Sequence, residues 1–510
     1  MAATDAQQTS SLDTARHIKY WQRCHGTYLP SAYTANDSTR LTFAYFIVSA
    51  LDLLSSPLSA EDRSAVRSWA LSLQHPDGGF CGSSTHTLPG LDAAKGSANL
   101  AATFFALLLL GVAADNDAEA RAAFAGVQRR KLLRWLRRLQ REDGSFGQIL
   151  WDGEPQGGRD MRHSYLVSGI RWMLRGPAEP GDEAWEDDVD VDAMVAHVRQ
   201  GQTYDGGLAE ASEHESHAGY AYCGIAALYM LNRPLSSSTG PPKGAAIAQG
   251  VVDRQALINF LAHRPFEYLA SREEEDDGEE GNFIGAEAGE PSSSKGSCHV
   301  GYNGRWNKKA DTCYCWWVAG ALTMLDGQDL INTAPSRRYM LDITQHQIGG
   351  LSKSVGGPPD VFHSYLGLGA LALLGEPGLK EFDVGLCCSR DTARKVGLAR
   401  DGLLEAQTTD GFDDDGFWES LAQGRNGAMA STPPQESAPD PWDDKTREKF
   451  EGKSKSEYYD PCQEAAQRSY RCLYRNGGDK SMCGDFFQAY RDCKQAWTER
   501  RKKESGGRFW

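Results

Sequence analysis

Wholly apolar stretches recur along the first four hundred residues and alternate with amphipathic ones. Leu100–Ala114, Ala218–Leu231 and Cys315–Leu325 are of the apolar kind. These stretches contain few β-branched runs and no alternating strand pattern, so they predict helices. A helix that is apolar on all sides is buried, whereas an amphipathic helix covers a core from outside. The pattern therefore predicts repeated helical hairpins, each with an inner and an outer helix.

A turn signal repeats between these helices. Each copy combines a residue that favours turns with glycine, which adopts positive φ without strain. The copies are Gln74–Phe80, Gln140–Phe146, Tyr204–Leu208, Tyr302–Arg305 and Gln347–Leu351. Regular repeats of a helical unit indicate a repeat architecture, and their spacing favours closure into a ring. The expected fold class is all-α, with an α-α toroid as the main unit.

Candidate chemistry gathers in the last third of this repeat region. Asp311, Cys313 and His363 offer one hard, one soft and one intermediate ligand to a single Zn²⁺. Three protein ligands leave a fourth position open, which is typical of catalytic zinc. Taken singly, such a histidine is most often a core residue and such a cysteine a small buried hydrophobe. Their co-occurrence in one repeated architecture favours the metal site.

Cations and hydrogen-bond donors surround these ligands in the sequence. Gly304–Lys308 lies just upstream, Tyr314 follows Cys313, and His217 precedes an earlier apolar helix. Such side chains suit a diphosphate leaving group.

Composition and charge narrow the class of protein. The net charge of −15 at pH 7 disfavours nucleic acid as a partner. The longest apolar run, Leu100–Ala114, is too short to span a membrane, so no transmembrane segment is expected. The first residues lack the apolar core of a signal peptide, and Asp5 and Asp13 disfavour a transit peptide. These features agree with a soluble intracellular protein.

Composition also suggests the domain boundaries. We expect the toroid at 1–400, with a low-complexity acidic insertion at about 234–297 in which 253–270 keeps a helix. Residues 401–455 read as a linker that is expected to be disordered. Residues 456–503 follow as a separate module.

This last module contains two Cys-x9-Cys pairs. Cys462 and Cys472 form the first pair, and Cys483 and Cys493 the second. Ten residues of helix rise ~15 Å, so two antiparallel helices with this spacing bring the cysteines together at both ends. We expect a helical hairpin with disulfides Cys462–Cys493 and Cys472–Cys483. Zinc is the competing interpretation, but structural zinc usually shows ligand gaps of two to four residues.

The repeat region resembles a known family, the β subunits of protein prenyltransferases, and most closely those of type I protein geranylgeranyltransferases. The resemblance covers residues 15 to 395. Its motifs are Trp21–Cys24, Thr39–Phe46, Asp160–Arg162, Ser216–Gly219, Asn307–Tyr314 and Asp360–Tyr365.

The resemblance assigns roles to individual residues. Asp311, Cys313 and His363 would bind one zinc ion. The isoprenoid diphosphate would be bound by His217, Arg305, Lys308 and Tyr314. Arg162 would lie near the carboxyl terminus of the acceptor peptide, and the funnel walls would be Tyr165, Tyr220, Trp316 and Trp317.

The resemblance also implies a reaction. The chain would pair with a prenyltransferase α subunit and transfer geranylgeranyl from geranylgeranyl diphosphate to proteins ending in Cys-a-a-X, such as Rho-type small GTPases. Zinc would deprotonate the substrate thiol, which then attacks C1 of the prenyl group.

Two positions favour the type I enzymes over the farnesyltransferases. Lys353 stands where farnesyltransferases and Rab-directed enzymes carry an acid that helps to recruit Mg²⁺, so no Mg²⁺ requirement is expected. Thr42 stands where farnesyltransferases place a bulky aromatic residue, so the pocket should accept the longer donor. A farnesyltransferase β subunit remains the alternative enzyme.

The C-terminal module, at about 440–503, resembles the twin Cys-x9-Cys (CHCH) assembly factors of mitochondrial cytochrome c oxidase. Those proteins are oxidised in the intermembrane space, whereas the enzyme resemblance implies the reducing cytosol, where disulfides are rare. The chain is therefore a fused or mispredicted gene product, or one module works outside its relatives' compartment. The alternative function is a non-enzymatic assembly factor with an N-terminal passenger.

Overall fold

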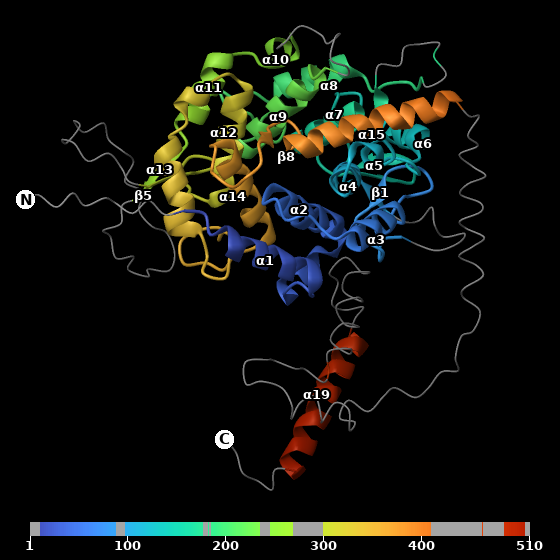
Figure 1. Cartoon of the computed structure of the whole chain (residues 1–510), viewed down its shortest axis with the longest axis vertical. Helices are drawn as coiled ribbons and strands as arrows, with labels where there is room; N and C mark the ends of the chain where they lie inside the picture. Colours follow the sequence, from blue (N-terminus) through green and yellow to red (C-terminus); the bar gives the residue numbers. More distant parts are fainter. Residues whose placement is uncertain are drawn as a thin grey trace, which may run out of the picture. The chain divides into compact units, whose positions relative to one another are not determined.

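The structure is a computed structural model that describes residues 11–87, 97–176, 182, 185–234, 245–268, 299–409, 462 and 484–504 (Figure 1). The chain divides into two compact units, Met1–Trp418 and Glu419–Trp510. The first unit holds the helices from α1 to α15, and the second holds α19.

In the described part of the first unit, six apolar helices form a closed inner ring. They are α2 (Arg40–Leu53), α4 (Leu100–Val112), α7 (Met161–Arg175), α9 (Ala218–Leu231), α12 (Thr312–Met324) and α14 (Val361–Leu373). Each helix contacts the next one, and α14 returns to contact α2 (Figure 1). Five of them begin at a capping side chain that accepts a hydrogen bond from the first turn, which satisfies otherwise unpaired N–H groups. These N-caps are Asn99, Asp160, His217, Asp311 and Asp360.

Shorter or amphipathic helices lie outside this ring. The outer helices are α1 (Thr14–Gly26), α3 (Ala60–Leu71), α6 (Arg129–Arg138), α8 (Val191–Gln200), α11 (Arg254–Ala262) and α13 (Thr333–Arg338). In α6, for example, Leu132 and Trp135 are buried, while Arg134 and Arg137 face solvent. Short connecting helices are η1 (Ser31–Thr39), α5 (Asp117–Arg121), α10 (Ala245–Gly250), η3 (Gln328–Leu330) and η4 (Tyr339–Thr344).

Among the described residues, four pairs of short antiparallel strands lie in the connections between helices. They are β1 (Phe80–Cys81) with β2 (Ala98–Asn99), β3 (Ile149–Trp151) with β4 (Glu154–Gln156), β5 (Pro265–Tyr268) with β6 (His299–Tyr302), and β7 (Phe382–Asp383) with β8 (Cys388–Ser389). Strands β5 and β6 flank 269–298, so α10, α11 and β5 all fall inside the segment where the acidic insertion was expected. Within that segment, residues 235–244 and 269–297 lie outside the described part of the chain.

A glutamine side chain joins four of the repeat turns to the next outer helix. The amide oxygen of Gln140 accepts from the backbone N–H of Asp190, which is the N-cap of α8, and its amide nitrogen donates to the Asp190 carbonyl. Gln74 and Gln202 make the corresponding bonds at the starts of α6 and α11. Gln345 accepts from Asp13 N–H, the N-cap of α1. This last bond joins the end of the ring to its beginning.

The glycines of these turns permit a close approach to the same helices. Gly144 has φ +79°, and a Cβ placed there would lie 1.9 Å from the Ala193 carbonyl oxygen of α8. Gly349 has φ +84°, and its Cβ would lie 2.2 Å from the Arg16 carbonyl oxygen of α1. Glycine is therefore required both by the backbone conformation and by the space.

An aromatic layer crosses the inside of the ring, with one side chain from each inner helix. Its members are Tyr45, Phe104, Tyr165, Tyr222, Trp316 and Tyr365, all buried. Neighbouring rings lie 5.3 to 5.8 Å apart at the contacts Phe104–Tyr165, Tyr165–Tyr222, Tyr222–Trp316 and Tyr45–Tyr365. Below the layer, the β7–β8 hairpin receives hydrogen bonds at two carbonyls: Cys387 from Tyr45 and Tyr365, and Val384 from Tyr222. The layer and the hairpin together close one end of the interior.

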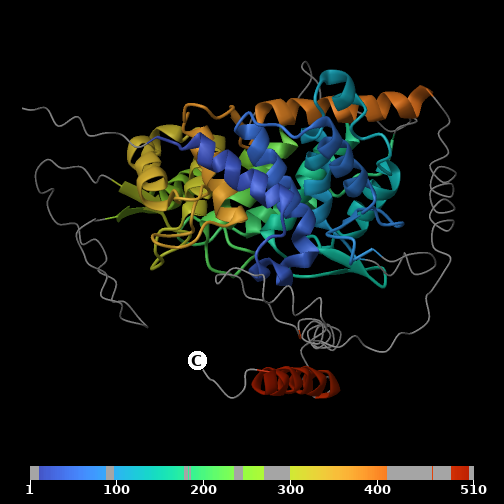
Figure 2. The same ribbon diagram turned by 60° about the horizontal axis from the view of Figure 1, so that its bottom comes forward.

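Helix α15 (Arg390–Thr409) lies along the face of the ring at that closed end (Figure 2). It contacts α4, α5 and α7. Its Val396 packs on Gly111, near the end of α4, and its Leu404 packs on Gly176, just after α7. The N-terminal ends of the inner helices therefore form the opposite, open end.

The second unit contains helix α19 (Gly484–Glu504) and a disulfide between Cys462 and Cys493. Cys472, Cys483 and their expected disulfide lie outside the described residues. Among the described residues, no helix is both long and apolar enough to cross a membrane.

The joint that closes the ring predicts a pH dependence. His17 on α1 is fully buried, with Nε2 3.2 Å from Gln345 Oε1. Burial lowers the pKa of His17 from 6.5 to about 4, against the opposing effects of Gln345 and Asp13. Between these values the unfolded state takes up a proton that the folded state does not, so stability should fall by up to about 3 kcal/mol as the pH drops from 6.5 to 4. Above pH 6.5 this residue contributes no pH dependence.

His17→Gln removes the titrating group but keeps a hydrogen-bonding side chain. Its thermal unfolding midpoint should therefore change less between pH 6.5 and 4 than that of the parent, while His25→Gln at the other end of α1 should follow the parent. Parallel curves for the parent and His17→Gln would contradict this assignment.

Candidate metal centre and active site

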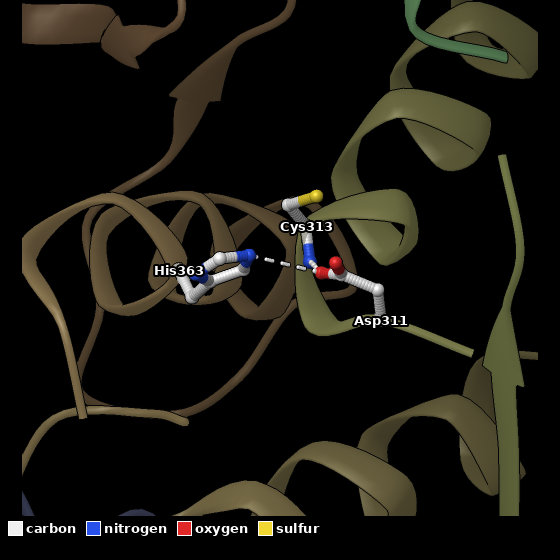
Figure 3. A group of neighbouring side chains, drawn as sticks. All are labelled: Asp311, Cys313 and His363. Atoms are coloured by element: carbon white, nitrogen blue, oxygen red, sulfur yellow. Dashed lines mark hydrogen bonds and ion pairs between the residues drawn. The ribbon is translucent and has the colours of Figure 1, made fainter. Parts of the chain in front are cut away.

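Asp311, Cys313 and His363 meet at the open end of the ring. Asp311 and Cys313 begin α12, and His363 lies in the first turn of the neighbouring α14 (Figure 3). One oxygen, one sulfur and one nitrogen from these three side chains lie within 4.8 Å of one another. The group is compact enough to hold one metal ion, and its donor set suits zinc.

The helix starts themselves position two of the ligands. Asp311 is the N-cap of α12, and its Oδ1 accepts from the Cys313 N–H at 3.0 Å. Asp360 caps α14 in the same way by accepting from the His363 N–H at 2.9 Å. Because both inner helices start at the same end of the ring, their first turns face each other.

Asp360 also orients the imidazole of His363. Its Oδ2 lies 2.6 Å from His363 Nδ1, so Nε2 is directed at Asp311 Oδ1, 3.1 Å away (Figure 3). A carboxylate on the far nitrogen of a ligating histidine fixes the ring and its tautomer and raises its basicity. Sequence reasoning gave Asp360 no role, although an acid three residues before the histidine at a helix start was a usable signal.

The electrostatics of the group favour a cation at its centre. Burial opposes the charged form of His363, but hydrogen bonds to Asp311 and Asp360 outweigh it and raise the pKa of His363 to about 9. Burial and the Asp311 carboxylate raise the pKa of the Cys313 thiol well above its usual range. Both pKa shifts show that added positive charge between the three side chains is stabilised, and a bound metal ion would supply that charge.

His217 and Tyr314 form a second polar pair at the same open end. His217 Nδ1 accepts from the Gly219 N–H at 3.0 Å, so in the neutral ring Nε2 carries the hydrogen. Nε2 lies 2.9 Å from the Tyr314 hydroxyl oxygen. Burial, aided by the Arg305 charge, lowers the pKa of His217 to about 4. His217 is therefore a neutral donor at pH 7, not a cation.

Three cations predicted for the site lie on loops near these groups. Arg305 is part-exposed and forms an ion pair with Glu215, and Lys308 is exposed on the same loop. The Gly304 carbonyl, at the start of this loop, accepts from the Ala218 N–H at 2.7 Å. Lys353 Nζ lies 3.8 Å from Asp311 Oδ2, which brings a charge to the metal group.

The residues assigned to walls and mouth divide by burial. Tyr165 and Trp316 belong to the aromatic layer, whereas Thr42, Tyr220 and Trp317 are partly buried. Arg162 bonds to the Asp160 carboxylate and lies over the Tyr220 ring, with 5.7 Å from its guanidinium carbon to the ring centroid. Its side chain is more than half exposed.

Comparison with known proteins identifies the family to which this architecture belongs. The family model described as "Prenyltransferase alpha-alpha toroid domain" matches residues 12–388. The chain belongs to this family. The predicted all-α toroid is thereby confirmed, as is the recognition of a prenyltransferase β-type chain.

Individual relatives agree with the family. The Arabidopsis thaliana protein "Geranylgeranyl transferase type-1 subunit beta" is 28% identical over 388 residues, which cover 73% of this chain and 87% of that protein. A solved chain of "Candida albicans protein geranylgeranyltransferase-I complexed with GGPP" has a TM-score of 0.60 at 23% identity, covering 76% of this chain and 98% of the other. At that identity the structure supports the fold alone.

The C-terminal module matches a different family. The Gibberella zeae protein "Cytochrome c oxidase-assembly factor COX23, mitochondrial" is 74% identical over 68 residues, which cover 13% of this chain and 73% of that protein. This segment belongs to the COX23 family. The second predicted resemblance and the Cys462–Cys493 disulfide are confirmed.

The geometry predicts how zinc content depends on single residues. Cys313→Ala and His363→Ala should lose the ion, because two remaining protein ligands hold it poorly. Asp360→Asn should keep the three ligands but weaken zinc affinity by roughly 10- to 100-fold, because the orienting carboxylate is lost. Cys315→Ala, which changes an equally buried thiol two residues along α12, should retain one zinc per chain. Metal analysis after dialysis and a zinc titration provide the measurement, and full zinc content in Cys313→Ala would refute the site.

Proposed function

We propose that residues 12–388 form the β subunit of a type I protein geranylgeranyltransferase. The observation that carries the proposal is that the Asp311, Cys313 and His363 group adjoins the His217 and Tyr314 pair. Tyr314 directly follows Cys313 on α12, so a site for a thiol and a site for a departing diphosphate share one helix start. The proposed reaction moves geranylgeranyl from its diphosphate to the cysteine thiol of a Cys-a-a-X protein.

Zinc, when bound by Asp311, Cys313 and His363, would supply a lowered thiol pKa and a fixed position for the substrate thiolate. Asp360 keeps His363 Nε2 available by holding Nδ1. The thiolate attacks C1 of the prenyl group as the bond from C1 to the diphosphate oxygen breaks.

The polar pair provides for the leaving group. Because His217 Nε2–H donates to the Tyr314 oxygen, the Tyr314 hydrogen is free to point onward to a diphosphate oxygen. Arg305 and Lys308 add positive charge from the neighbouring loop. Donors fixed in advance in a site with little water stabilise developing charge more than water does.

Lys353 supports the type I assignment and a reaction without Mg²⁺. Its ammonium group lies beside the Asp311 carboxylate, at the edge of the metal group. A tethered cation here would stand in for the charge that a magnesium ion brings to the diphosphate.

The donor proposal rests on the small side chain of Thr42. Thr42 is a small, partly buried residue on the first turn of α2, above the closed aromatic layer. A small side chain leaves room for the fourth isoprene unit, and each buried CH₂ contributes about 0.8 kcal/mol. Thr42 and Lys353 together disfavour the farnesyltransferase alternative.

Partners follow from the same proposal. A prenyltransferase α subunit would complete the heterodimer, and Arg162 would meet the carboxyl terminus of the acceptor. Acceptors would be Rho-type small GTPases ending in Leu or Phe, modified in the cytoplasm. For the C-terminal segment, its 74% identity over 68 residues favours a second function as a cytochrome c oxidase assembly factor in the mitochondrial intermembrane space.

Thr42→Trp tests the donor. An added indole should fill the volume of the terminal isoprene, so the ratio of kcat/KM for geranylgeranyl diphosphate to that for farnesyl diphosphate should fall by roughly 5- to 150-fold, because overpacking costs about 1–3 kcal/mol. The assay uses the heterodimer and a Leu-ending peptide, with Thr34→Trp in the exposed η1 segment as control. An unchanged ratio would show that Thr42 does not set donor length.

Lys353→Asp tests the metal requirement. The parent should be indifferent to added Mg²⁺, whereas the variant should be slower without Mg²⁺ and should recover as Mg²⁺ is added, since a carboxylate can recruit the ion. Lys19→Asp, on the exposed side of α1, should behave as the parent. A Lys353→Asp variant with parental rates and no response to Mg²⁺ would place Lys353 away from the diphosphate.

A further inference from the structure

Arg264 is a buried cation at a position where the other turns carry uncharged residues. Each turn is closed by a β-bridge between two residues. The residue just before the first of these accepts, through its carbonyl, a hydrogen bond from the backbone N–H of the residue just after the second. These acceptors are Leu73, Leu139, Gly201, Arg264 and Thr344. The next position holds Gln74, Gln140, Gln202, Pro265 and Gln345, so the fourth turn also lacks the glutamine that joins the others to an outer helix. Arginine at the fourth turn therefore requires a separate explanation.

The Arg264 side chain is held between two aromatic rings. Its exposure is 0%, and Nε donates to the Phe260 carbonyl at 3.1 Å. The guanidinium carbon lies 4.6 Å from the centroid of the Phe260 ring and 4.0 Å from that of the Trp306 ring. Within the described residues, its two terminal nitrogens have no hydrogen-bond partner. Burial lowers the pKa of Arg264 to about 10, so the group remains charged at pH 7.

Trp306 connects this buried charge to the proposed diphosphate loop. It lies between Arg305 and Asn307, and Asn307 has φ +58°, a left-handed conformation that costs a residue other than glycine energy. Trp306 is 53% exposed, so it adds little to the core, yet one face of its ring stacks on Arg264. A cation over an indole face is the strongest form of this contact among aromatic side chains.

Asp205 provides the second anchor for Trp306. Although burial opposes its charged form, hydrogen bonds from Ser216, Thr203, the Gly207 N–H and the Trp306 indole lower the pKa of Asp205. The Ser216 hydroxyl donates to it at 2.6 Å, and Ser216 directly precedes His217. Asp205 thus touches both the loop that carries Arg305 and the residue before His217, and its charge favours the cationic form of Arg264.

We propose that Arg264, Trp306 and Asp205 form a positioning cluster that holds Arg305 and His217 in register for the diphosphate group of the donor. This inference rests on the proposed function. The cluster does not touch the reacting atoms. It fixes a loop whose backbone conformation is unfavourable and whose charged side chains are otherwise exposed, and an ordered loop loses less entropy when the diphosphate binds.

The test uses the zinc-loaded heterodimer and two single substitutions, one at a buried residue and one at a half-exposed residue. Arg264→Leu installs the residue that the first two turns carry, and Trp306→Leu changes a half-exposed residue. Both should raise the KM for geranylgeranyl diphosphate and the inhibition constant of inorganic diphosphate by roughly tenfold. The kcat at saturating donor should fall as well, because Arg305 and His217 are proposed to stabilise charge on the leaving group, whereas the KM for the peptide should stay within about twofold.

Trp306→Phe provides the conservative comparison. It keeps a ring over Arg264 but removes the indole N–H toward Asp205. The KM for geranylgeranyl diphosphate and the inhibition constant of inorganic diphosphate should therefore rise about threefold. Trp151→Leu on β3, which is 60% exposed, is the matched control and should leave all constants unchanged.

The outcomes separate this inference from the proposed function. Parental inhibition by inorganic diphosphate in Trp306→Leu and Arg264→Leu would overturn the cluster while leaving the enzyme assignment intact. A lower unfolding temperature with unchanged constants would also overturn it, because that is the signature of a purely structural role. If Arg264→Leu does not fold, Trp306→Leu decides the question. A parent heterodimer that neither binds nor uses geranylgeranyl diphosphate would remove the proposed function and the inference with it.

Discussion

A pair of hydrogen bonds from one glutamine amide determines how this toroid closes. At Gln74, Gln140 and Gln202 the amide oxygen and nitrogen bind backbone groups at the start of the next outer helix. Gln345 repeats the bond to the N–H of Asp13 and so returns the chain to its first helix. These bonds are part-buried at Gln74 and Gln345 and exposed at Gln140 and Gln202. Each contributes about 0.5–1.5 kcal/mol, and two bonds from one amide favour a single register at each joint. Glycines beside the joints allow the close approach that these bonds require.

The fixed register explains why the site forms where it does. Since every repeat enters its inner helix from the same side, the first turns of α12 and α14 lie next to each other. N-capping requires Asp, Asn, Ser, Thr or a similar acceptor at these positions, and three of the caps, Asp311, Asp360 and His217, also serve the site. Local helix chemistry and candidate catalytic chemistry thus use the same side chains. At the opposite end, tyrosine hydroxyls of the inner helices donate to carbonyls of the β7–β8 hairpin and close the interior.

Sequence patterns predicted the repeat, the toroid and the three metal-ligand candidates because each depends on residues that are close together in the sequence or at the start of a predicted helix. The turn signals stand beside their helices, and Asp311 is itself the N-cap of the helix that carries Cys313. Contacts between repeats could not be predicted in this way. The ion pair of Glu215 with Arg305 and the approach of Asp205 to Trp306 depend on which loops the ring brings together. His217 was predicted among cations and donors, and only its burial and the Gly219 N–H identify it as a neutral donor.

The described cysteines of the first unit are free thiols, whereas Cys462 and Cys493 of the second unit form a disulfide. The burial of the free thiols bears on how readily they are oxidised. Thiolates, not thiols, react with oxidants and disulfides. In the described part of the toroid, burial raises the pKa of Cys81, Cys223, Cys315, Cys387 and Cys388, which keeps these groups protonated and enclosed. Apart from the half-buried Cys24, the described free thiols of the first unit are therefore poorly reactive toward oxidants and disulfides. Burial and the Asp311 carboxylate raise the pKa of Cys313 in the same way, so this thiol too is protonated and enclosed. The zinc proposed between Asp311, Cys313 and His363 would require its thiolate, so metal binding rather than exposure is what would activate it.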